Sequence, residues 1–240
     1  MHVEFDNLCL KVGEEQIERI WYDCPKKSFK FVGLHIDEHL SWDHQVQHVH
    51  NKLSSGNYAI NSAKNFLPLH IRKNIYNSLF RSHLEYGIIA WGGISNNKLK
   101  GIIGLQKKCV RNVANKLKLS HSDPIFSSLE ILKFPDLVVY NSLLFMHKFA
   151  FGLQPPTFND MFHPLGVNNR TGNYRLVKYN AKFFDHFPSV YLPKIWNEYS
   201  SKIKHCITIT SLKSLLTDLL ISKYKTRESC GFVRCPDCST

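Results

Sequence analysis

The chain has 240 residues, of which 43% are hydrophobic, and this apolar content suffices for a packed core and excludes wholesale disorder. An excess of 31 Lys and Arg over 19 Asp and Glu leaves a formal net charge of +12, which favours a polyanionic partner. No apolar run approaches the roughly 20 residues of a spanning helix, no signal peptide opens the chain, and the seven cysteines are scattered. We therefore expect an intracellular protein, nuclear or cytoplasmic, with no membrane contact and with nucleic acid as its first candidate partner.

The chain begins with a β pattern and then changes to a helical one. Residues 1–36 alternate partly between apolar and polar side chains, with a turn near Gly13. Ser41 is placed to cap the helix that follows, and Pro68 suits the first turn of the next helix. Spacings of three and four place these residues on one face of the first helix: Trp42, Val46, Val49, Leu53, Gly56, Ile60, Ala63 and Leu67.

Further helices are predicted along the rest of the chain. A second spans roughly residues 68–91, GGISNN breaks the chain, and a third runs to about Leu117. Asp123 and Pro124 mark another helix start, and FPDLVVYNSLLFMHKF has a helical apolar pattern. Residues 152–188 are rich in turn formers and should be loop with one or two short strands, such as YRLVKY. The last helices are predicted in YLPKIWNEYSSKI and SLKSLLTDLLISKY.

The predicted fold class is α+β and mainly α. A short N-terminal β-hairpin precedes a helical bundle and a loop-rich helical region. The expected divisions are a β segment at 1–40, a helical bundle at 41–120, a helical region with loops and short strands at 121–225, and a cysteine-containing tail at 226–240.

Asp37 and Glu38 form an acidic pair between the last strand and the first helix. A polymerase holds two metal ions with carboxylates that lie close together. Neighbouring residues of an extended segment point to opposite sides, so this pair suits metal binding poorly. We favour the interpretation that the two carboxylates stabilise the amino end of the helix.

The segment HQVQH, residues 44–48, has two histidines four residues apart. A zinc protease requires glutamate directly after the first histidine, and here Gln45 stands in that place. His44 and His48 also lie away from the Trp42 face. The pattern therefore indicates a polar helix surface.

The tail CGFVRCPDC offers Cys230, Cys235 and Cys238 at spacings that suit zinc ligands. A tetrahedral structural site needs a fourth ligand, which the tail does not supply. Zinc binding and a frayed tail of free thiols both stay open.

A basic strip lies beside the apolar face of the third helix. The apolar face comprises Leu99, Ile102, Ile103, Val110, Val113 and Leu117, and the strip comprises Lys100, Lys107, Arg111 and Lys118. Such a strip can follow a phosphate backbone or can be a solvated surface.

Seven segments occur in an order typical of one family: FKFVGLHIDEHLSWDHQVQHV, SHLEYGIIAWGG, LQKKCVR, HSDPIFSSLEIL, MHKFAFGLQPPTF, NNRTGNYRL and PKIWNEYSSKI. Over about residues 29–204 the chain resembles the carboxy-terminal part of the reverse transcriptase of non-LTR (LINE-type, jockey-like) retrotransposons. The resemblance implies that Phe31, Val32 and Gly33 occupy the primer-grip hairpin at the end of the palm, with Val32 in place of leucine. The helical bundle would be the thumb, which contacts the backbone of RNA or an RNA–DNA hybrid.

The chain departs from this family in its catalytic motifs. It has neither the aspartate of an early palm strand nor a Tyr-x-Asp-Asp-like turn, and WYDC at residues 21–24 contains a single aspartate. We expect no catalytic residue and no polymerase activity in this chain, and magnesium only in a full-length enzyme whose palm precedes Met1. The expected function is that of a truncated RNA-directed DNA polymerase fragment that retains nucleic-acid binding. The alternative is a domesticated or inert helical protein-interaction domain.

Overall fold

The structure is a computed structural model that describes residues 10–12, 15–17, 28–165, 172–177, 182–203 and 206–225. The chain divides into two compact units, Met1–Gln45 and Val46–Thr240. In the described part, short antiparallel hairpins lie near the N-terminus and helices make up most of the remainder. The prediction of a mainly helical chain with a short N-terminal hairpin is thus confirmed.

Two small hairpins form the described strands of the first unit. Strand β1 (Leu10–Val12) pairs with β2 (Glu15–Ile17), and β3 (Phe29–Phe31) pairs with β4 (Leu34–Ile36). The second hairpin turns through Val32 and Gly33, whose φ angles of 44° and 80° are both positive. Two-residue turns of this kind match the right-handed twist of the paired strands, and glycine adopts them without steric cost.

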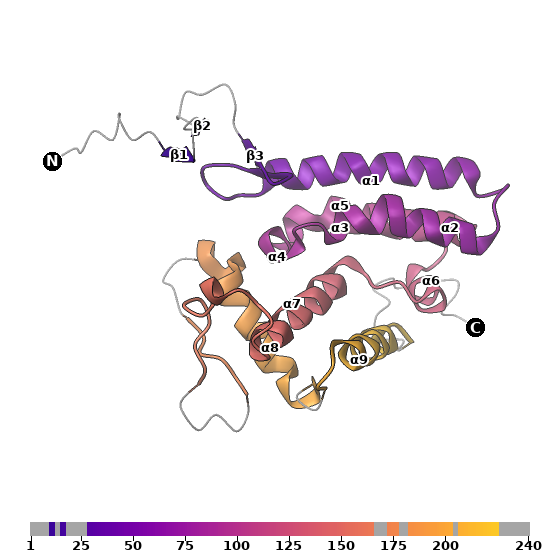
Figure 1. The fold of residues 1–240 in the computed structure, drawn as a ribbon. Helices are drawn as coiled ribbons and strands as arrows, with labels where there is room; N and C mark the ends of the chain where they lie inside the picture. The colour runs from indigo at the N-terminus through magenta and orange to yellow at the C-terminus, as the bar shows by residue number, and fades with distance from the viewer. Residues whose placement is uncertain are drawn as a thin grey trace. The chain divides into compact units, whose positions relative to one another are not determined.

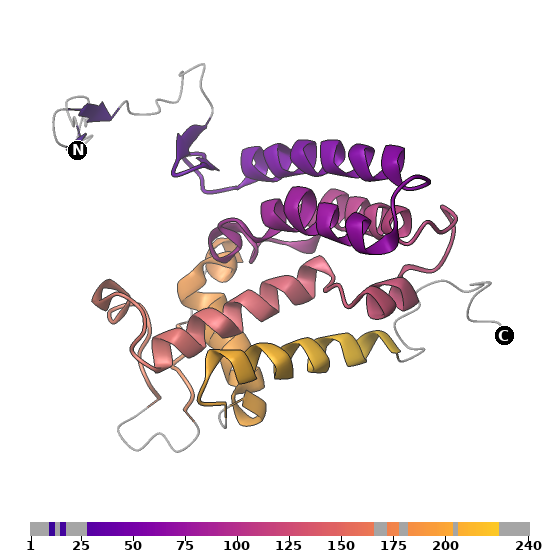
Figure 2. The same ribbon diagram turned by 45° about the vertical axis from the view of Figure 1, so that its right-hand side comes forward.

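Helices dominate the second unit, and Figures 1 and 2 show their order. The first group is α1 (Asp43–Ala63, which begins in the first unit), α2 (Leu69–Tyr76), the π-helix η1 (Asn77–Arg81), α3 (Ser82–Glu85), α4 (Ile88–Trp91) and α5 (Asn96–Val113). The second group is α6 (Ser122–Leu129), α7 (Phe134–Ala150), the 3₁₀-helices η2 (Pro156–Phe158) and η3 (Lys182–His186), α8 (Pro188–Ile203), α9 (Ile209–Ser222) and the 3₁₀-helix η4 (Lys223–Lys225).

The region predicted as one helix over 68–91 is broken into four elements. The α-helical hydrogen bonding of α2 changes to a π-helical turn in η1 and returns in α3. Gly87, with a φ of 61°, then separates α3 from α4. A single helix was therefore the wrong prediction, because the apolar spacing continues across turns that the backbone does not keep α-helical.

Helix α7 is central to the packing of the second unit. It contacts α3, α4 and α5, and it also contacts α8 and α9. Both views place α7 between α5 and α9 (Figures 1 and 2). Its own sequence explains this position, because buried residues occur on several sides of it: Phe134, Leu137, Val138, Tyr140, Leu143 and Met146.

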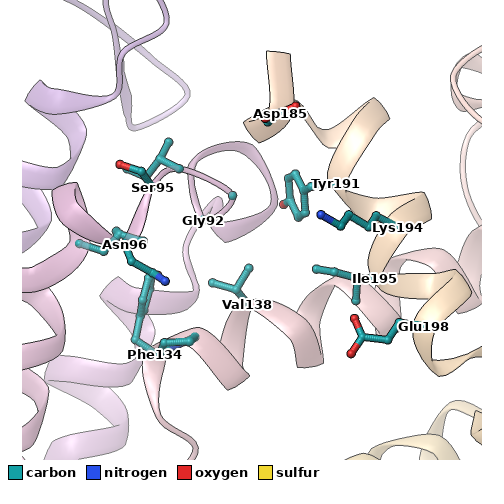
Figure 3. A pocket seen from close by; sticks show the side chains of 14 residues that line it. Gly92, Ser95, Asn96, Phe134, Val138, Asp185, Tyr191, Lys194, Ile195 and Glu198 are labelled. Atoms are coloured by element: carbon teal, nitrogen blue, oxygen red, sulfur yellow. The ribbon is translucent and has the colours of Figure 1, made fainter. Parts of the chain in front are cut away.

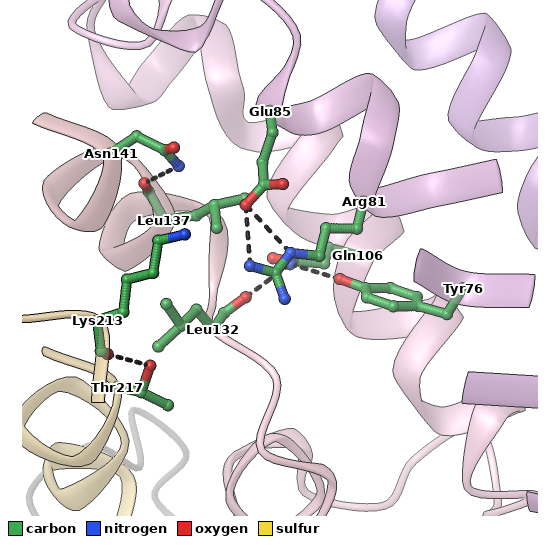
Figure 4. A network of polar contacts seen from close by, with 9 residues as sticks. All are labelled: Tyr76, Arg81, Glu85, Gln106, Leu132, Leu137, Asn141, Lys213 and Thr217. Atoms are coloured by element: carbon green, nitrogen blue, oxygen red, sulfur yellow. Dashed lines mark hydrogen bonds and ion pairs between the residues drawn. The ribbon is translucent and has the colours of Figure 1, made fainter. Parts of the chain in front are cut away.

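One glutamine connects α2, α5 and the start of α7 inside this core. The Gln106 side-chain amide donates to the Tyr76 hydroxyl and to the Leu132 carbonyl, each at 3.0 Å. Its carbonyl oxygen accepts from the Phe134 backbone N–H at 2.8 Å. Figure 4 shows Gln106, Tyr76 and Leu132 next to the ion pair of Arg81 and Glu85. Since a buried polar group is costly unless it is hydrogen-bonded, these bonds fix how the three elements meet.

A second polar cluster holds the end of the described chain against α6 and α7. The Tyr224 hydroxyl donates to an Asp136 carboxylate oxygen at 2.6 Å and accepts from the Lys133 backbone N–H at 3.0 Å. The Lys133 ammonium lies 2.8 Å from an Asp123 carboxylate oxygen and 4.3 Å from the Tyr224 ring centre. These two hydrogen bonds of Tyr224 join residues that lie 88 and 91 positions apart in the sequence.

The loop-rich region predicted at 152–188 is largely irregular where it is described. It contains η2, η3 and an isolated bridge between Pro164 and Tyr174. The Asn197 side chain of α8 holds Tyr174 by donating to its carbonyl and accepting from its N–H, at 2.8 and 2.9 Å. Tyr174 begins the predicted strand YRLVKY, whose last residues lie outside the described part.

Candidate nucleic-acid interface

Helix α5 carries the predicted basic strip on an amphipathic surface. Leu99, Ile102, Val110 and Val113 are at most 2% exposed, as the predicted apolar face requires. At 100° per residue, Lys100, Lys107 and Arg111 lie within about 40° of one another on the helix. Lys100 is exposed, and Lys107 and Arg111 are half-buried. Three of the four predicted basic residues therefore share one face of α5.

The fourth residue of the strip, Lys118, lies beyond the helix in an exposed turn. The predicted helix end at Leu117 was wrong, because α5 ends at Val113 and Leu117 is 81% exposed. Asn115, with a φ of 51°, terminates the helix. The Asn115 N–H donates to the Asn112 carbonyl and the Lys116 N–H donates to the Arg111 carbonyl, which is the Schellman arrangement of a helix C-terminus.

Arg111 connects the helix to the loop that follows it. Its Nε atom donates to the Ser120 carbonyl at 2.7 Å. Burial lowers the pKa of its guanidinium group below the ordinary value. Arg111 therefore positions the loop that presents Lys116 and Lys118, and it is less accessible than Lys100.

The net charge of the protein is concentrated in one stretch of sequence. Between His44 and Ser122 the chain has twelve Lys and Arg and a single acidic residue, Glu85. Glu85 forms an ion pair with Arg81, with Nη2 and Oε1 2.9 Å apart. The twelve are Lys52, Lys64, Arg72, Lys73, Arg81, Lys98, Lys100, Lys107, Lys108, Arg111, Lys116 and Lys118. The strip on α5 is thus one part of a larger basic region, which a charge count along the sequence would have found.

Helix α1 lies alongside α5 in this basic region. The Asn112 side-chain amide of α5 donates to the Asn57 side-chain oxygen of α1 at 2.9 Å, and both residues are buried. Nearer the amino ends of the two helices, a Cβ atom on Gly101 would lie 3.4 Å from the His50 ring. Because both contacts advance in the same chain direction, α1 and α5 run parallel.

A cavity of about 380 Å³ lies between the α4–α5 loop, α7 and α8 (Figure 3). Phe134, Val138 and Ile195 contribute apolar lining, while Lys194 lines it together with the carboxylates of Asp185 and Glu198. Two carboxylates beside one ammonium group disfavour a polyanion. The cavity is therefore a poorer candidate for phosphate binding than the face of α5.

The hairpin tip predicted as the primer grip presents apolar side chains. Phe31 is 59% exposed and Val32 is 71% exposed, and Gly33 completes the turn between β3 and β4. These three residues belong to the first unit. Their role as a primer grip stays a prediction that follows from the resemblance.

Asp37 organises the loop before α1. Its carboxylate accepts hydrogen bonds from the backbone N–H groups of His39, Ser41 and Trp42, and from the Ser41 hydroxyl, at 2.9 to 3.1 Å. Burial acts to raise the pKa of Asp37, but these hydrogen bonds together hold it below the ordinary value. Asp37 is buried and Glu38 is exposed, and Glu38 lies in a turn closed by the Leu40 N–H, which donates to the Asp37 carbonyl, rather than on the extended segment that the sequence predicted.

The HQVQH segment contributes a structural contact. The buried Gln45 side chain accepts from the His35 backbone N–H at 2.9 Å, which ties β4 to the first turn of α1. His44 is exposed and His48 is half-buried. Among the described residues, no group of three or more His, Cys, Asp or Glu side chains is placed to hold a metal ion. The predicted ligands Cys230, Cys235 and Cys238 lie outside the described residues.

Within the described residues, no helix combines the length and the apolar character needed to cross a membrane. Comparisons with protein-family models, with curated proteins and with solved structures each find no match to this chain.

Proposed function

We propose that this chain binds nucleic acid through contacts to the phosphate backbone and that it corresponds to the thumb and carboxy-terminal part of a non-LTR retrotransposon reverse transcriptase. The partner would be RNA or an RNA–DNA hybrid. The observation that carries the proposal is the solvent side of α5, which combines the exposed Lys100 and Lys108 with the half-buried Lys107 and has no acidic residue. Lysines that neutralise phosphates release condensed counterions, so such a face gains affinity for any phosphate backbone.

The surroundings of α5 support the same function. The loop that Arg111 holds adds Lys116 and Lys118, both exposed. The single acidic residue of the region, Glu85, is already paired with Arg81. A phosphate backbone on this surface would therefore meet lysines from the helix and from the loop, without a competing free carboxylate from residues 44–122.

The test is a measurement of salt-dependent binding to a fluorescent RNA and to the matching RNA–DNA hybrid. One variant combines Lys100→Gln, Lys107→Gln and Lys118→Gln. Arg111 is left intact because its bond to Ser120 holds the loop. If each lysine contacts one phosphate, the slope of log affinity against log salt should fall by roughly 0.7–0.9 per lysine.

A matched control removes the same charge from exposed lysines of α7, α8 and α9, through Lys148→Gln, Lys202→Gln and Lys213→Gln. The control should keep most of the affinity and of the slope. If the two triple variants lose equal affinity, the attraction comes from diffuse net charge and not from the face of α5. Absence of binding by the parent protein would leave the helical protein-interaction domain as the remaining function.

A further inference from the structure

The exposed side of α1 differs in chemistry from that of α5. Its neutral polar and aromatic residues form a stripe within about 80° of one another at 100° per residue. The stripe consists of Gln47, Asn51, Ser54, Tyr58 and Asn61. Tyr58 is 74% exposed, and the Gln47 side-chain amide donates to the Asn51 side-chain oxygen at 2.9 Å. We call this set the neutral stripe of α1.

The neutral stripe lies next to the face of α1 that contacts α5. His50 and Asn57 of α1 touch α5, as the approach to Gly101 and the bond to Asn112 show. The residues of the stripe follow these two positions around the helix on the solvent side. Since the helices run parallel, the neutral stripe runs beside the lysines of α5 along the length they share.

We propose that a single strand of nucleic acid lies along both helices, with its phosphates on the lysines of α5 and its bases over the neutral stripe of α1, where Tyr58 stacks on a base. This inference rests on the proposed function and names the form of nucleic acid bound. Surfaces that bind single strands combine a cationic track for the backbone with aromatic side chains for the bases. The α5 lysines and Tyr58 supply these two components on adjacent helices.

The uneven charge of the two helices favours a single strand over a duplex. A duplex keeps its base faces stacked inside, so it can use only the lysines of α5, whereas a single strand can also place its bases on the neutral stripe. The neutral stripe offers side-chain amides and an aromatic ring, which suit exposed base edges and faces. Between the two rows of side chains, a Cβ atom on Gly104 would meet no other atom within 4 Å, so the surface there is low and open to a backbone.

The test compares binding of a 12-nucleotide single-stranded RNA with binding of the matching blunt RNA–DNA hybrid. Tyr58→Ala should weaken single-strand binding roughly 5- to 150-fold, the range measured for loss of one stacked base. It should leave hybrid binding within about twofold, because the bases of a duplex are stacked on one another everywhere except at its two ends. Tyr58→Phe keeps the ring and should bind the single strand about as well as the parent. Tyr86→Ala, at an exposed aromatic residue between α3 and α4, is the matched control and should change neither.

The outcomes separate this inference from the proposed function. A parent protein that binds the hybrid more tightly than the single strand would overturn the inference while leaving backbone binding intact. If Tyr58→Ala affects both ligands equally, or affects neither, the inference is also overturned and backbone binding stays intact. If the triple lysine variant binds as tightly as the parent, the proposed function fails and the inference fails with it.

Discussion

The side-chain amide of Gln106 donates a hydrogen bond to the Tyr76 hydroxyl at 3.0 Å, and each of the two residues is only 1% exposed. The same glutamine satisfies the Leu132 carbonyl and the Phe134 N–H. Gln106→Leu would leave these buried backbone groups without their partner. We expect a loss of about 3 kcal/mol in the free energy of unfolding, measured by urea denaturation.

The control for this prediction is Gln47→Leu, because Gln47 is exposed on α1. It should change the free energy of unfolding by no more than about 0.5 kcal/mol. Similar stabilities for the two leucine variants would show that the Gln106 hydrogen bonds do not hold the core together.

Substitution of alanine for glycine should have opposite effects on stability at two positions. A Cβ atom on Gly56 would lie 2.8 Å from the Leu79 carbonyl oxygen, whereas one on Gly104 would meet nothing within 4 Å. Gly56→Ala should destabilise the fold by about 1–3 kcal/mol, since α1 must move away from η1. Gly104→Ala should stabilise it by about 0.5–1 kcal/mol, because alanine restricts the unfolded chain and favours the helix. Urea unfolding of both variants measures the difference.

The loop before α1 should depend on the ionised carboxylate of Asp37. Asp37→Ala removes the acceptor used by His39, Ser41 and Trp42, so their amide hydrogens should exchange at least about 10-fold faster in NMR hydrogen exchange. Glu38→Gln, at the exposed neighbour, should leave these exchange rates unchanged.

Acid should have the same effect as the Asp37 substitution. The pKa of Asp37 is lower in the folded state than its ordinary value of 3.8. The stabilisation is therefore present above pH 3.8 and is lost as the pH falls through the lowered pKa. Protection of the three amides should decrease in that range in the parent protein, and protection that persists to still lower pH would contradict the prediction.

Alkaline pH should destabilise the core through buried tyrosine. Burial raises the pKa of Tyr76 above its ordinary value of 10.0, and the hydrogen bond from Gln106 offsets this only in part. Above about pH 10 the unfolded chain releases the Tyr76 proton while the folded chain keeps it, so the free energy of unfolding falls as pH rises. Between about pH 10 and pH 11, Tyr76→Phe should reduce that fall by about 1 kcal/mol, as measured by urea unfolding. Identical slopes in the two proteins would exclude Tyr76 as a contributor.

Sequence periodicity predicted the helices better than their ends. The apolar face of α5 was correct through Val113, because spacings of three and four reflect burial along a regular helix. It failed at Leu117, since one left-handed residue, Asn115, turns the chain and exposes a leucine that fits the pattern. The pattern also missed the π-helical turn of η1, which keeps the apolar spacing while the backbone hydrogen bonds change.

The polar contacts between distant elements were beyond the reach of sequence patterns. Gln106 occupies a core position among Ile102, Cys109 and Val110, and a glutamine there indicates burial but does not identify its partners. Those partners come from α2 and from the start of α7, and only the packed chain brings them together. Arg111 was likewise assigned to phosphate from its place on the strip, although its Nε atom holds the Ser120 carbonyl.

The concentration of charge between His44 and Ser122 affects how the protein behaves on charged surfaces. This stretch has twelve cationic and one acidic side chain, so the remaining residues together are nearly neutral. Local fields, rather than the net charge, govern the approach of a large polyion. The protein should therefore be retained on a heparin column even near its isoelectric point, and it should adsorb there in a preferred orientation, with the basic stretch toward the resin.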